Sequence, residues 1–216
     1  MNEPRRAPRL GPPARDQFDA IYAGAPPWDI GRPQPAFATL ADQGRLTGRV
    51  LDPGCGTGEH TLMAARLGHD STGIDVAPTA ITRANAKLAT VAEQGINLPA
   101  HFLTGDVRDL PALSLAPFDT ALDSGVFHVF DDTDRPVYVG SLHAVLTPGA
   151  HLLLLCFSDH EPGDWGPRRV TKAELRSAFA HGWTINSITP ATFVVNRPAA
   201  HSPSQAQAWL ADITRN

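Results

Sequence analysis

The stretch Val50-Leu51-Asp52-Pro53-Gly54-Cys55-Gly56-Thr57-Gly58-Glu59-His60-Thr61 decides the fold of this 216-residue chain. An apolar strand over 49–52 leads into a turn with glycine at three alternate positions, and the apolar-periodic segment 61–67 then predicts a helix. Glycines in such a turn adopt positive φ and let a ligand approach the main chain, while the first amides of the helix offer unpaired donors. The stretch therefore predicts a nucleotide-like ligand at a strand-to-helix turn.

The dinucleotide fingerprint G-x-G-x-x-G is incomplete here. The pattern is G-x-G-x-G, and Glu59 stands where the third glycine of the fingerprint would fall. Pyrophosphate binding depends on that glycine, whereas a ligand that presents a carboxylate or a ribose does not need it. An NAD(P)-dependent oxidoreductase is thus an open alternative that Glu59 disfavours.

Two further acids close the next predicted strands. Thr72-Gly73-Ile74-Asp75-Val76 predicts a second strand ending in Asp75, the position and residue type that bind both hydroxyls of a ribose. Leu103-Thr104-Gly105-Asp106-Val107 closes a third strand. Asp106 can accept a hydrogen bond from an exocyclic amine, while Val107 can flank a purine ring.

Together with Leu146-Thr147-Pro148-Gly149-Ala150, these motifs resemble in order and spacing those of class I S-adenosylmethionine (SAM) dependent methyltransferases. The resemblance spans residues 49–157, about half the chain. It implies that the glycine turn holds the methionine part of SAM, Asp75 the ribose, and Asp106 with Val107 the adenine. The implied cofactor-binding residues are Trp28, Arg32, Asp52, Gly54, Cys55, Gly56, Gly58, Thr61, Asp75, Val76, Asp106, Val107 and Asp123.

The alternation of predicted elements indicates the fold class. Strands are expected near 49–52, 71–75, 101–105, 118–123 and 150–157, and helices near 59–67, 78–94, 134–146 and 171–180. Alternation of this kind implies a parallel sheet with helices on both faces. The segments 183–188 and 191–196, separated by Thr189-Pro190, are expected to form a closing hairpin, with a final helix near 205–213. We therefore expect an α/β fold, a Rossmann-like, seven-stranded, mostly parallel sheet with an antiparallel last strand.

The N-terminal region divides into two parts. Residues 1–15, rich in proline and arginine, predict a disordered tail. Residues 16–216 predict a single methyltransferase domain, with an N-terminal lid over 16–45 that contains short helices at 16–22 and 35–43.

Within this lid, Trp28-Asp29-Ile30-Gly31-Arg32-Pro33 is similar to the stretch preceding the core in thiopurine-methyltransferase-like and related small-molecule methyltransferases. There it covers the cofactor and helps to form the acceptor pocket. The alternative is a surface loop whose Trp28 fills a gap.

The loop after the fourth strand is expected to face the same crevice as the glycine turn. His128 is the best candidate for a general base because an imidazole titrates near neutrality, and a hydrogen-bonded structural histidine is the alternative. Asp123 is expected to contact SAM or the acceptor, or else to cap the following turn. The predicted catalytic residues are His128 and Asp123, and the predicted substrate-binding residues are Phe18, Tyr22, Trp28, Phe127 and His128.

The composition of the chain limits the kinds of partner that we expect it to bind. A net charge of -4 and a pI of about 6.1 give no electrostatic footprint for nucleic acid or an anionic membrane. Asp123-Ser124-Gly125-Val126 also lacks the Asn/Asp-Pro-Pro-aromatic run of nucleic-acid amino-methyltransferases.

Cys55 and Cys156 fit two reduced thiols rather than a disulfide framework or a metal pattern, so no metal is expected. No secretory signal or membrane-spanning run is evident, and a cytoplasmic monomer or homodimer with a small-molecule acceptor is expected.

The sequence thus predicts a SAM-dependent methyltransferase that modifies oxygen, nitrogen or sulfur of a small aromatic or heterocyclic molecule. The chain also resembles small bacterial methyltransferases that modify hydroxyquinolone-like or other heterocyclic toxins and drugs, a resemblance that implies detoxification. A catalytically silent SAM-binding module is the second alternative beside the oxidoreductase.

Overall fold

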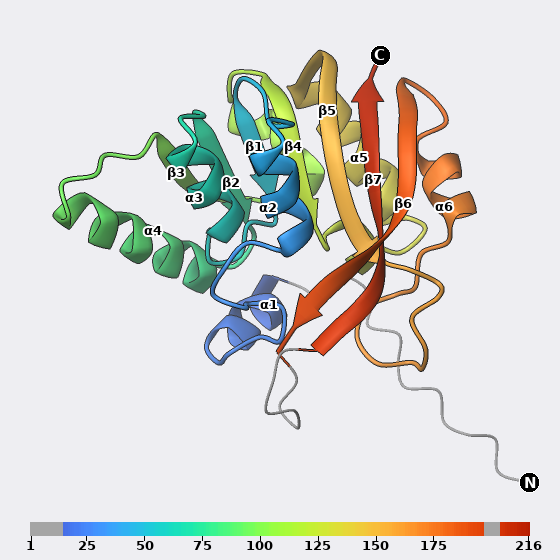
Figure 1. Ribbon diagram of the computed structural model, residues 1–216, viewed down its shortest axis with the longest axis horizontal. Coiled ribbons are helices and arrows are strands. Elements are labelled where there is room, and N and C mark those ends of the chain that lie inside the picture. The colour runs from blue at the N-terminus through green and yellow to red at the C-terminus, as the bar shows by residue number, and fades with distance from the viewer. Residues whose placement is uncertain (1–14, 197–203) are drawn as a thin grey trace, which may run out of the picture.

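The computed structural model describes residues 15–196 and 204–216, and these contain one seven-stranded sheet of order β3-β2-β1-β4-β5-β7-β6 (Figure 1). The strands are β1 (Val50–Pro53), β2 (Ser71–Asp75), β3 (Ala100–Thr104), β4 (Phe118–Ser124), β5 (Leu146–Phe157), β6 (Trp183–Val195) and β7 (Ser204–Arg215). The helices are α1 (Arg15–Tyr22), α2 (Pro35–Asp42), α3 (Glu59–Arg66), α4 (Pro78–Glu93), α5 (Asp134–Val145) and α6 (Lys172–Ala178), with short 3-10 helices η1 (Val107–Leu113) and η2 (Phe127–Val129).

Strand directions confirm the predicted fold class. The five strands β3, β2, β1, β4 and β5 pair in parallel, whereas β7 lies antiparallel to both β5 and β6. The strand order reverses at β1, which lies between β2 and β4. Ligands in such sheets bind beyond the carboxyl ends of the strands at this reversal, and the glycine turn follows β1 there.

Helices cover both faces of the sheet (Figure 1). One core cluster joins η1, α5 and α6 to the sheet through fully buried side chains such as Leu110, Tyr138 and Leu175. On the opposite face, α2 and α3 pack through Phe37 and Ala64 against side chains of β1, β4 and β5. The strands of the middle of the sheet are buried on both faces for this reason.

The C-terminal prediction was wrong in two respects. The expected hairpin within 183–196 does not form, because β6 runs without interruption through Thr189-Pro190. Its antiparallel partner is β7, in the segment for which the sequence predicted a helix. Both differences have a physical reason in the position of these strands within the sheet.

The strand β7 forms because it buries apolar side chains on both faces of the sheet. Ala206 and Ala208 pack into the cluster on the α2 side, while Trp209, Ala211 and Ile213 pack into the cluster on the α5 side. The buried positions change face between Ala208 and Trp209, so no single period-2 pattern runs through the whole segment. Burial in the sheet overrides the helix propensity of its alanines.

Pro190 is tolerated because β6 is the edge strand. The main-chain N–H and C=O of Val194 point away from β7, towards Gln34, and Pro190 lies four residues earlier on the same uninterrupted register. Its missing N–H therefore falls on the outer edge, where no ladder bond is lost.

The N-terminal helices agree with the prediction. Arg15 already begins α1, one residue inside the expected tail, and the rest of that tail lies outside the described residues. The division into a single domain with a lid over 16–45 stays a prediction. Among the described residues, no helix has both the length and the apolar character needed to cross a bilayer.

Gly73 offers a test of the packing between β2, α3 and β3. A Cβ atom at this position would lie 2.6 Å from Thr61 Oγ1 and 2.8 Å from both Cys55 Sγ and Phe102 Cδ1. We expect Gly73→Ala to lower the free energy of unfolding by about 1–3 kcal/mol, the usual cost of overpacking a core. Urea unfolding followed by circular dichroism measures this change.

The matched control is Gly140→Ala in α5, where the added methyl group would meet nothing within 4 Å. Alanine in a helix interior is favoured over glycine by about 0.5–1 kcal/mol, so this variant is expected to be slightly stabilised. Equal stability of the two variants would contradict the close packing described for Gly73.

Candidate functional site

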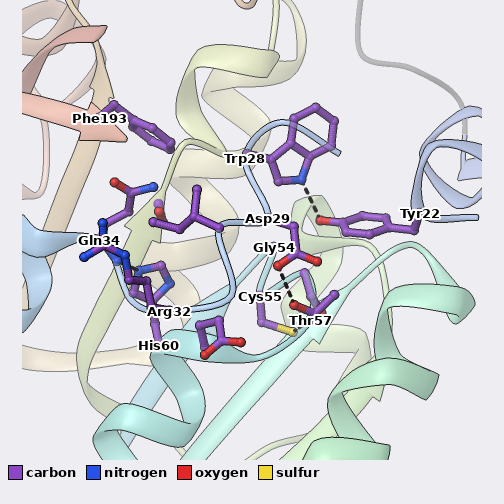
Figure 2. A pocket seen from close by; sticks show the side chains of 14 residues that line it. Tyr22, Trp28, Asp29, Arg32, Gln34, Gly54, Cys55, Thr57, His60 and Phe193 are labelled. Carbon is purple, nitrogen blue, oxygen red and sulfur yellow. Dashed lines mark hydrogen bonds between the residues drawn. The ribbon is translucent and has the colours of Figure 1, made fainter. Parts of the chain in front are cut away.

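A pocket lies at the carboxyl ends of β1 and β4, between the glycine turn and residues 26–34, which we call the strap (Figure 2). The strap connects α1 to α2 and passes over the turn. Side chains from the strap, the turn, the start of α3 and the end of β6 line the pocket. It therefore occupies the position at which a sheet of this order binds its ligand.

The glycine turn is closely packed on both sides. Gly54, Gly56 and Gly58 have φ values of 69°, 53° and 88°, in the region that favours glycine. A Cβ atom at Gly54 would lie 2.3 Å from a methyl group of Val126, and one at Gly56 would lie 2.7 Å from the hydroxyl oxygen of Tyr22. Side chains at these positions would fill the space against which a ligand must lie.

Asp75, at the end of β2, is held by the turn itself. Its Oδ2 accepts a hydrogen bond from the Gly56 amide at 2.9 Å, and its Oδ1 accepts one from the Ala77 amide at 2.9 Å. Burial raises the pKa of this carboxyl group, while the amide bonds oppose that change. Each oxygen keeps a lone pair that can accept from a ribose hydroxyl.

Asp52, at the end of β1, fastens α3 to the sheet. Its Oδ2 accepts from the Thr61 amide at 3.0 Å and from the Thr61 hydroxyl at 2.7 Å. Its Oδ1 is buried and has no hydrogen-bond partner among the described residues. Desolvation raises the pKa of Asp52 to about 7, so its carboxyl group is partly protonated near neutral pH.

The residues of this site fit SAM. The helix α3 follows Gly58, which provides no side-chain cap, so in the described part of the chain the amides before Thr61 have no side-chain acceptor. Arg32 lines the pocket, and its guanidinium group makes no hydrogen bond or ion pair with the other described residues. A methionine carboxylate is the kind of group that both features bind.

Aromatic side chains of the N-terminal segment form one wall. The Trp28 indole N–H donates to the Tyr22 hydroxyl at 2.9 Å, and the two rings meet edge to face. Both residues line the pocket, as predicted. Phe18 packs behind them, with its ring centroid 6.5 Å from that of Trp28, and does not itself line the pocket.

The loop after β4 is organised by Asp123. Its carboxylate accepts from the amides of Val126 at 2.8 Å and Phe127 at 3.1 Å, and from the Tyr138 hydroxyl at 2.9 Å. Burial raises the pKa of Asp123 to about 6, against the effect of these bonds. These contacts match the alternative in which Asp123 caps the turn that follows β4. The carboxylate does not line the pocket.

His128 is buried beside the rings of Phe157 and Phe193. The Phe157 amide donates to its Nδ1 at 3.0 Å, which places the proton of the neutral ring on Nε2. Desolvation lowers the pKa of His128 to about 3, so the ring is neutral at physiological pH. In this geometry neither nitrogen has a free lone pair for a proton, and the geometry supports the structural alternative more than the base.

Two other predicted groups lie away from the pocket. The Phe127 ring stacks on Phe179 at 5.7 Å within the core. The Asp106 carboxylate caps η1 and pairs with Arg108 at 2.6 Å, which lowers its pKa. Val107 is buried in the core beside η1, and an adenine contact at this end of β3 stays a prediction.

The structure brings only part of the predicted set into contact with the pocket. The predicted residues that line it are Tyr22, Trp28, Arg32, Gly54, Cys55 and Gly56. Those that do not line it are Phe18, Asp52, Gly58, Thr61, Asp75, Val76, Asp106, Val107, Asp123, Phe127 and His128. Lining residues that the sequence reasoning missed are Asp29, Ile30, Gln34, Thr57, Glu59, His60, Ser124 and Phe193.

Some of the missed residues had a signal in the sequence. Thr57, Glu59 and His60 lie inside the stretch that was identified first, and Asp29 and Ile30 lie inside the strap motif. Phe193 had none, because its place at the pocket depends on the position of β6 in the sheet. The described residues contain no group of three or more His, Cys, Asp or Glu side chains that could hold a metal ion.

Comparison with known proteins agrees with this site. The chain matches the thiopurine S-methyltransferase (TPMT) family over residues 17–216. It is 35% identical over 194 residues to 2-heptyl-1-hydroxyquinolin-4(1H)-one methyltransferase of Mycobacteroides abscessus, covering 84% of this chain and 82% of that protein. It is 33% identical over 160 residues to the Arabidopsis thaliana protein named "Probable thiol methyltransferase 2", covering 73% and 68%.

A solved structure is also similar. It comes from a study of the conversion of a disulfide bond into a thioacetal group during echinomycin biosynthesis, and it is 36% identical with a TM-score of 0.83 over 94% of this chain and 93% of that chain. The sheet order, the glycine turn and these similarities define a SAM-dependent methyltransferase that acts on small molecules. The chain belongs to the thiopurine S-methyltransferase family, and its methyl donor is SAM. The oxidoreductase alternative is thereby set aside.

The role of Asp75 can be measured directly. Loss of hydrogen bonds between a charged group and the ribose costs about 1.5–3 kcal/mol, so Asp75→Ala should weaken S-adenosylhomocysteine binding by that amount. Isothermal titration calorimetry on the folded variant gives the affinity. Asp109→Ala, on the exposed side of η1, is the control, and an unchanged affinity in the Asp75 variant would remove this assignment.

The buried Asp52 carboxyl group makes stability depend on pH. Its pKa in the folded protein, about 7, lies above its unfolded value, so the folded state holds a proton that the unfolded chain has lost. By itself this group lowers the free energy of unfolding as the pH rises from about 4 to about 7. His60 and His128, whose pKa values burial lowers to about 4 and about 3, act in the opposite direction over this range, so the prediction concerns the difference between variant and wild type. The free energy of unfolding of Asp52→Asn, relative to that of wild type at the same pH, should rise as the pH rises from about 4 to about 7.

Urea unfolding of both proteins across this pH range measures the difference, with Asp109→Asn as the control that should follow the wild type. A difference between Asp52→Asn and wild type that does not change with pH would contradict the assignment.

Proposed function

We propose that the acceptor is a small planar heteroaromatic molecule, methylated on an oxygen or sulfur atom that ionises near neutral pH. The observation that carries the proposal is the pocket wall made by Trp28 and Phe193, which face the same space at the end of β4 (Figure 2). Aromatic walls favour flat, polarisable ligands because ring faces and edges stack on one another.

The named acceptors of relatives support this class. One relative is named for a hydroxyquinolone, a fused planar ring that carries a hydroxyl group on nitrogen, and another is named for thiols. Both kinds of acceptor have an acidic hydrogen on the atom that would be methylated. Such an atom becomes nucleophilic once its proton has left to solvent.

Binding of SAM supplies an electrophilic methyl group on a positively charged sulfur atom. The residues of this chain would hold it at three points: the glycine turn and Arg32 at the methionine part, Asp75 at the ribose, and the end of β3 at the adenine. Positioning of two reactants in this way contributes up to about 7–11 kcal/mol when the geometry is ideal.

We infer that the reaction uses no protein base at His128. Nδ1 of the neutral ring accepts a hydrogen bond from the Phe157 amide, so the role of His128 is to hold the end of β5 beside the acceptor wall. Asp123 acts in the same manner, since it fixes the turn that carries Val126 and Phe127. The acceptor then reacts in its ionised form, and the strap keeps water from the site.

The proposal extends to the cell compartment, the oligomeric state and the biological role. Two buried free thiols, Cys55 and Cys156, fit a reducing cytoplasm. We infer a monomer or homodimer, without nucleic acid or membrane as partner, in which methylation caps a reactive heterocycle and so detoxifies it. The net charge of -4 is consistent with a small-molecule acceptor.

A methylation screen read by mass spectrometry tests this function. Purified protein and SAM are incubated with 2-alkyl-1-hydroxyquinolin-4-ones, hydroxyquinolines, phenols, azoles, alkyl thiols and thiocyanate. We expect fused-ring acceptors to have a kcat/KM about fivefold or more above that of alkyl thiols, because stacking in the pocket adds about 1 kcal/mol. A pH profile of kcat/KM should shift with the pKa of each acceptor.

Preference for thiocyanate or alkyl thiols would overturn the proposed acceptor class, and no product with any acceptor would favour a silent SAM-binding protein. A pH profile that stays the same across acceptors of different acidity would restore a protein base. His128→Asn, compared with wild type across this profile, separates a loss of positioning from a loss of proton transfer.

A further inference from the structure

Gln34 makes an unusual connection between the strap and the edge of the sheet. It immediately precedes α2, yet its side chain does not cap that helix. Its carboxamide Nε2 donates to the Val194 carbonyl at 2.9 Å, and its Oε1 accepts from the Val194 amide at 2.9 Å. A side-chain amide thus reproduces the two bonds that a neighbouring strand would make with β6.

Burial makes these bonds important. Gln34 is 2% exposed and Val194 is 3% exposed, so water cannot replace either bond. Since β6 is the edge strand, the N–H and C=O of Val194 have no partner on this side except Gln34. A buried main-chain group without a partner is destabilising by about 1–3 kcal/mol.

The main chain of Gln34 is held as well. Its amide donates to Nε2 of His60 at 3.0 Å, which connects the strap to the first turn of α3. Burial lowers the pKa of His60 to about 4, so this imidazole stays neutral and able to accept at physiological pH. The His60 ring also lies edge-on against Phe37 of α2.

The connection places two walls of the pocket relative to each other. Phe193, next to Val194 in β6, and Arg32 of the strap both line the pocket, with Gln34 between them (Figure 2). Asn196 adds a second connection nearby, because its amide donates to Pro27 O at 2.7 Å. The glycine turn is fixed to β2 through Ile74 and Asp75, and the Thr57 hydroxyl also donates to Asp29 of the strap at 3.0 Å (Figure 2).

We propose that Gln34 is a positioning residue of the acceptor site, whose side-chain amide joins the strap to β6 and so sets the width available to a planar acceptor. This inference rests on the proposed function. Removal of the amide separates the strap from Phe193, which loosens the grip on the acceptor and leaves Asp75 and the bonds of the glycine turn to β2 in place. Planar acceptors then lose their advantage over small flexible thiols.

Three variants test the proposal. Gln34→Met keeps the size of the side chain and removes both hydrogen bonds. Gln34→Glu keeps the acceptor for the Val194 amide and, when ionised, sets a carboxylate against the Val194 carbonyl. Gln94→Glu, at the exposed end of α4, is the control for an added negative charge.

The first readouts are the KM of a 2-alkyl-1-hydroxyquinolin-4-one and the affinity for S-adenosylhomocysteine. In Gln34→Met we expect the acceptor KM to rise about tenfold or more, as the loss of buried hydrogen bonds implies, with a smaller loss of cofactor affinity, because Arg32 belongs to the strap whereas Asp75 and the glycine turn are held by β2. As the acceptor KM rises, the ratio of kcat/KM for the quinolone to kcat/KM for an alkyl thiol should fall.

The glutamate variant adds a test that a merely structural role would not satisfy. A protonated carboxyl group donates from one oxygen and accepts at the other, so it can make both bonds of the amide. The acceptor KM of Gln34→Glu, relative to wild type at the same pH, should therefore recover as the pH falls. Gln94→Glu should follow the wild type throughout.

Hydrogen–deuterium exchange supplies a readout that needs no acceptor. In Gln34→Met, exchange should increase together in 28–34 and 193–195 and stay unchanged in 54–58. Unchanged exchange, an unchanged acceptor KM, or a glutamate variant with no pH-dependent recovery would overturn the proposal. A wild type that prefers thiols contradicts only the proposed acceptor class, and the KM comparison is then made with the thiol.

Discussion

Three carboxylates buried at the carboxyl ends of β1, β2 and β4 hold the loops of this protein in place. Asp52 accepts from the Thr61 amide, Asp75 from the amides of Gly56 and Ala77, and Asp123 from those of Val126 and Phe127. Because a buried carboxylate is unfavourable without donors, each acid and the amides it binds require one another. The cofactor seat and the turn beside the acceptor depend on this arrangement.

Much of the cofactor side of the site could be predicted from the sequence, because its residues follow their strands directly. The glycine turn comes after β1 and Asp75 closes β2, so residue type and order were sufficient. The acceptor side could not be predicted in this way. Gln34 and Val194 are 160 positions apart, and nothing local in either segment indicates the other.

The same limit explains the C-terminal error. The alternation that identifies a half-buried strand is interrupted in β7, because its buried positions change face between Ala208 and Trp209, and its alanines favour a helix when considered alone. Only the insertion of β7 between β5 and β6 reveals why the segment is extended. The position of Phe193 at the pocket follows from that insertion and was missed for the same reason.

The two halves of the site are therefore held by different kinds of contact. The cofactor seat is built from consecutive loops in the middle of the chain, and its geometry is determined by bonds within a few residues of each strand. The acceptor site joins the strap near the N-terminus to β6 near the C-terminus, through side-chain bonds from Gln34 and Asn196. Substitutions in either terminal region can alter the acceptor wall without disturbing Asp75 or the glycine turn. A family with one methyl donor can thus include relatives named for acceptors as different as a thiol and a hydroxyquinolone.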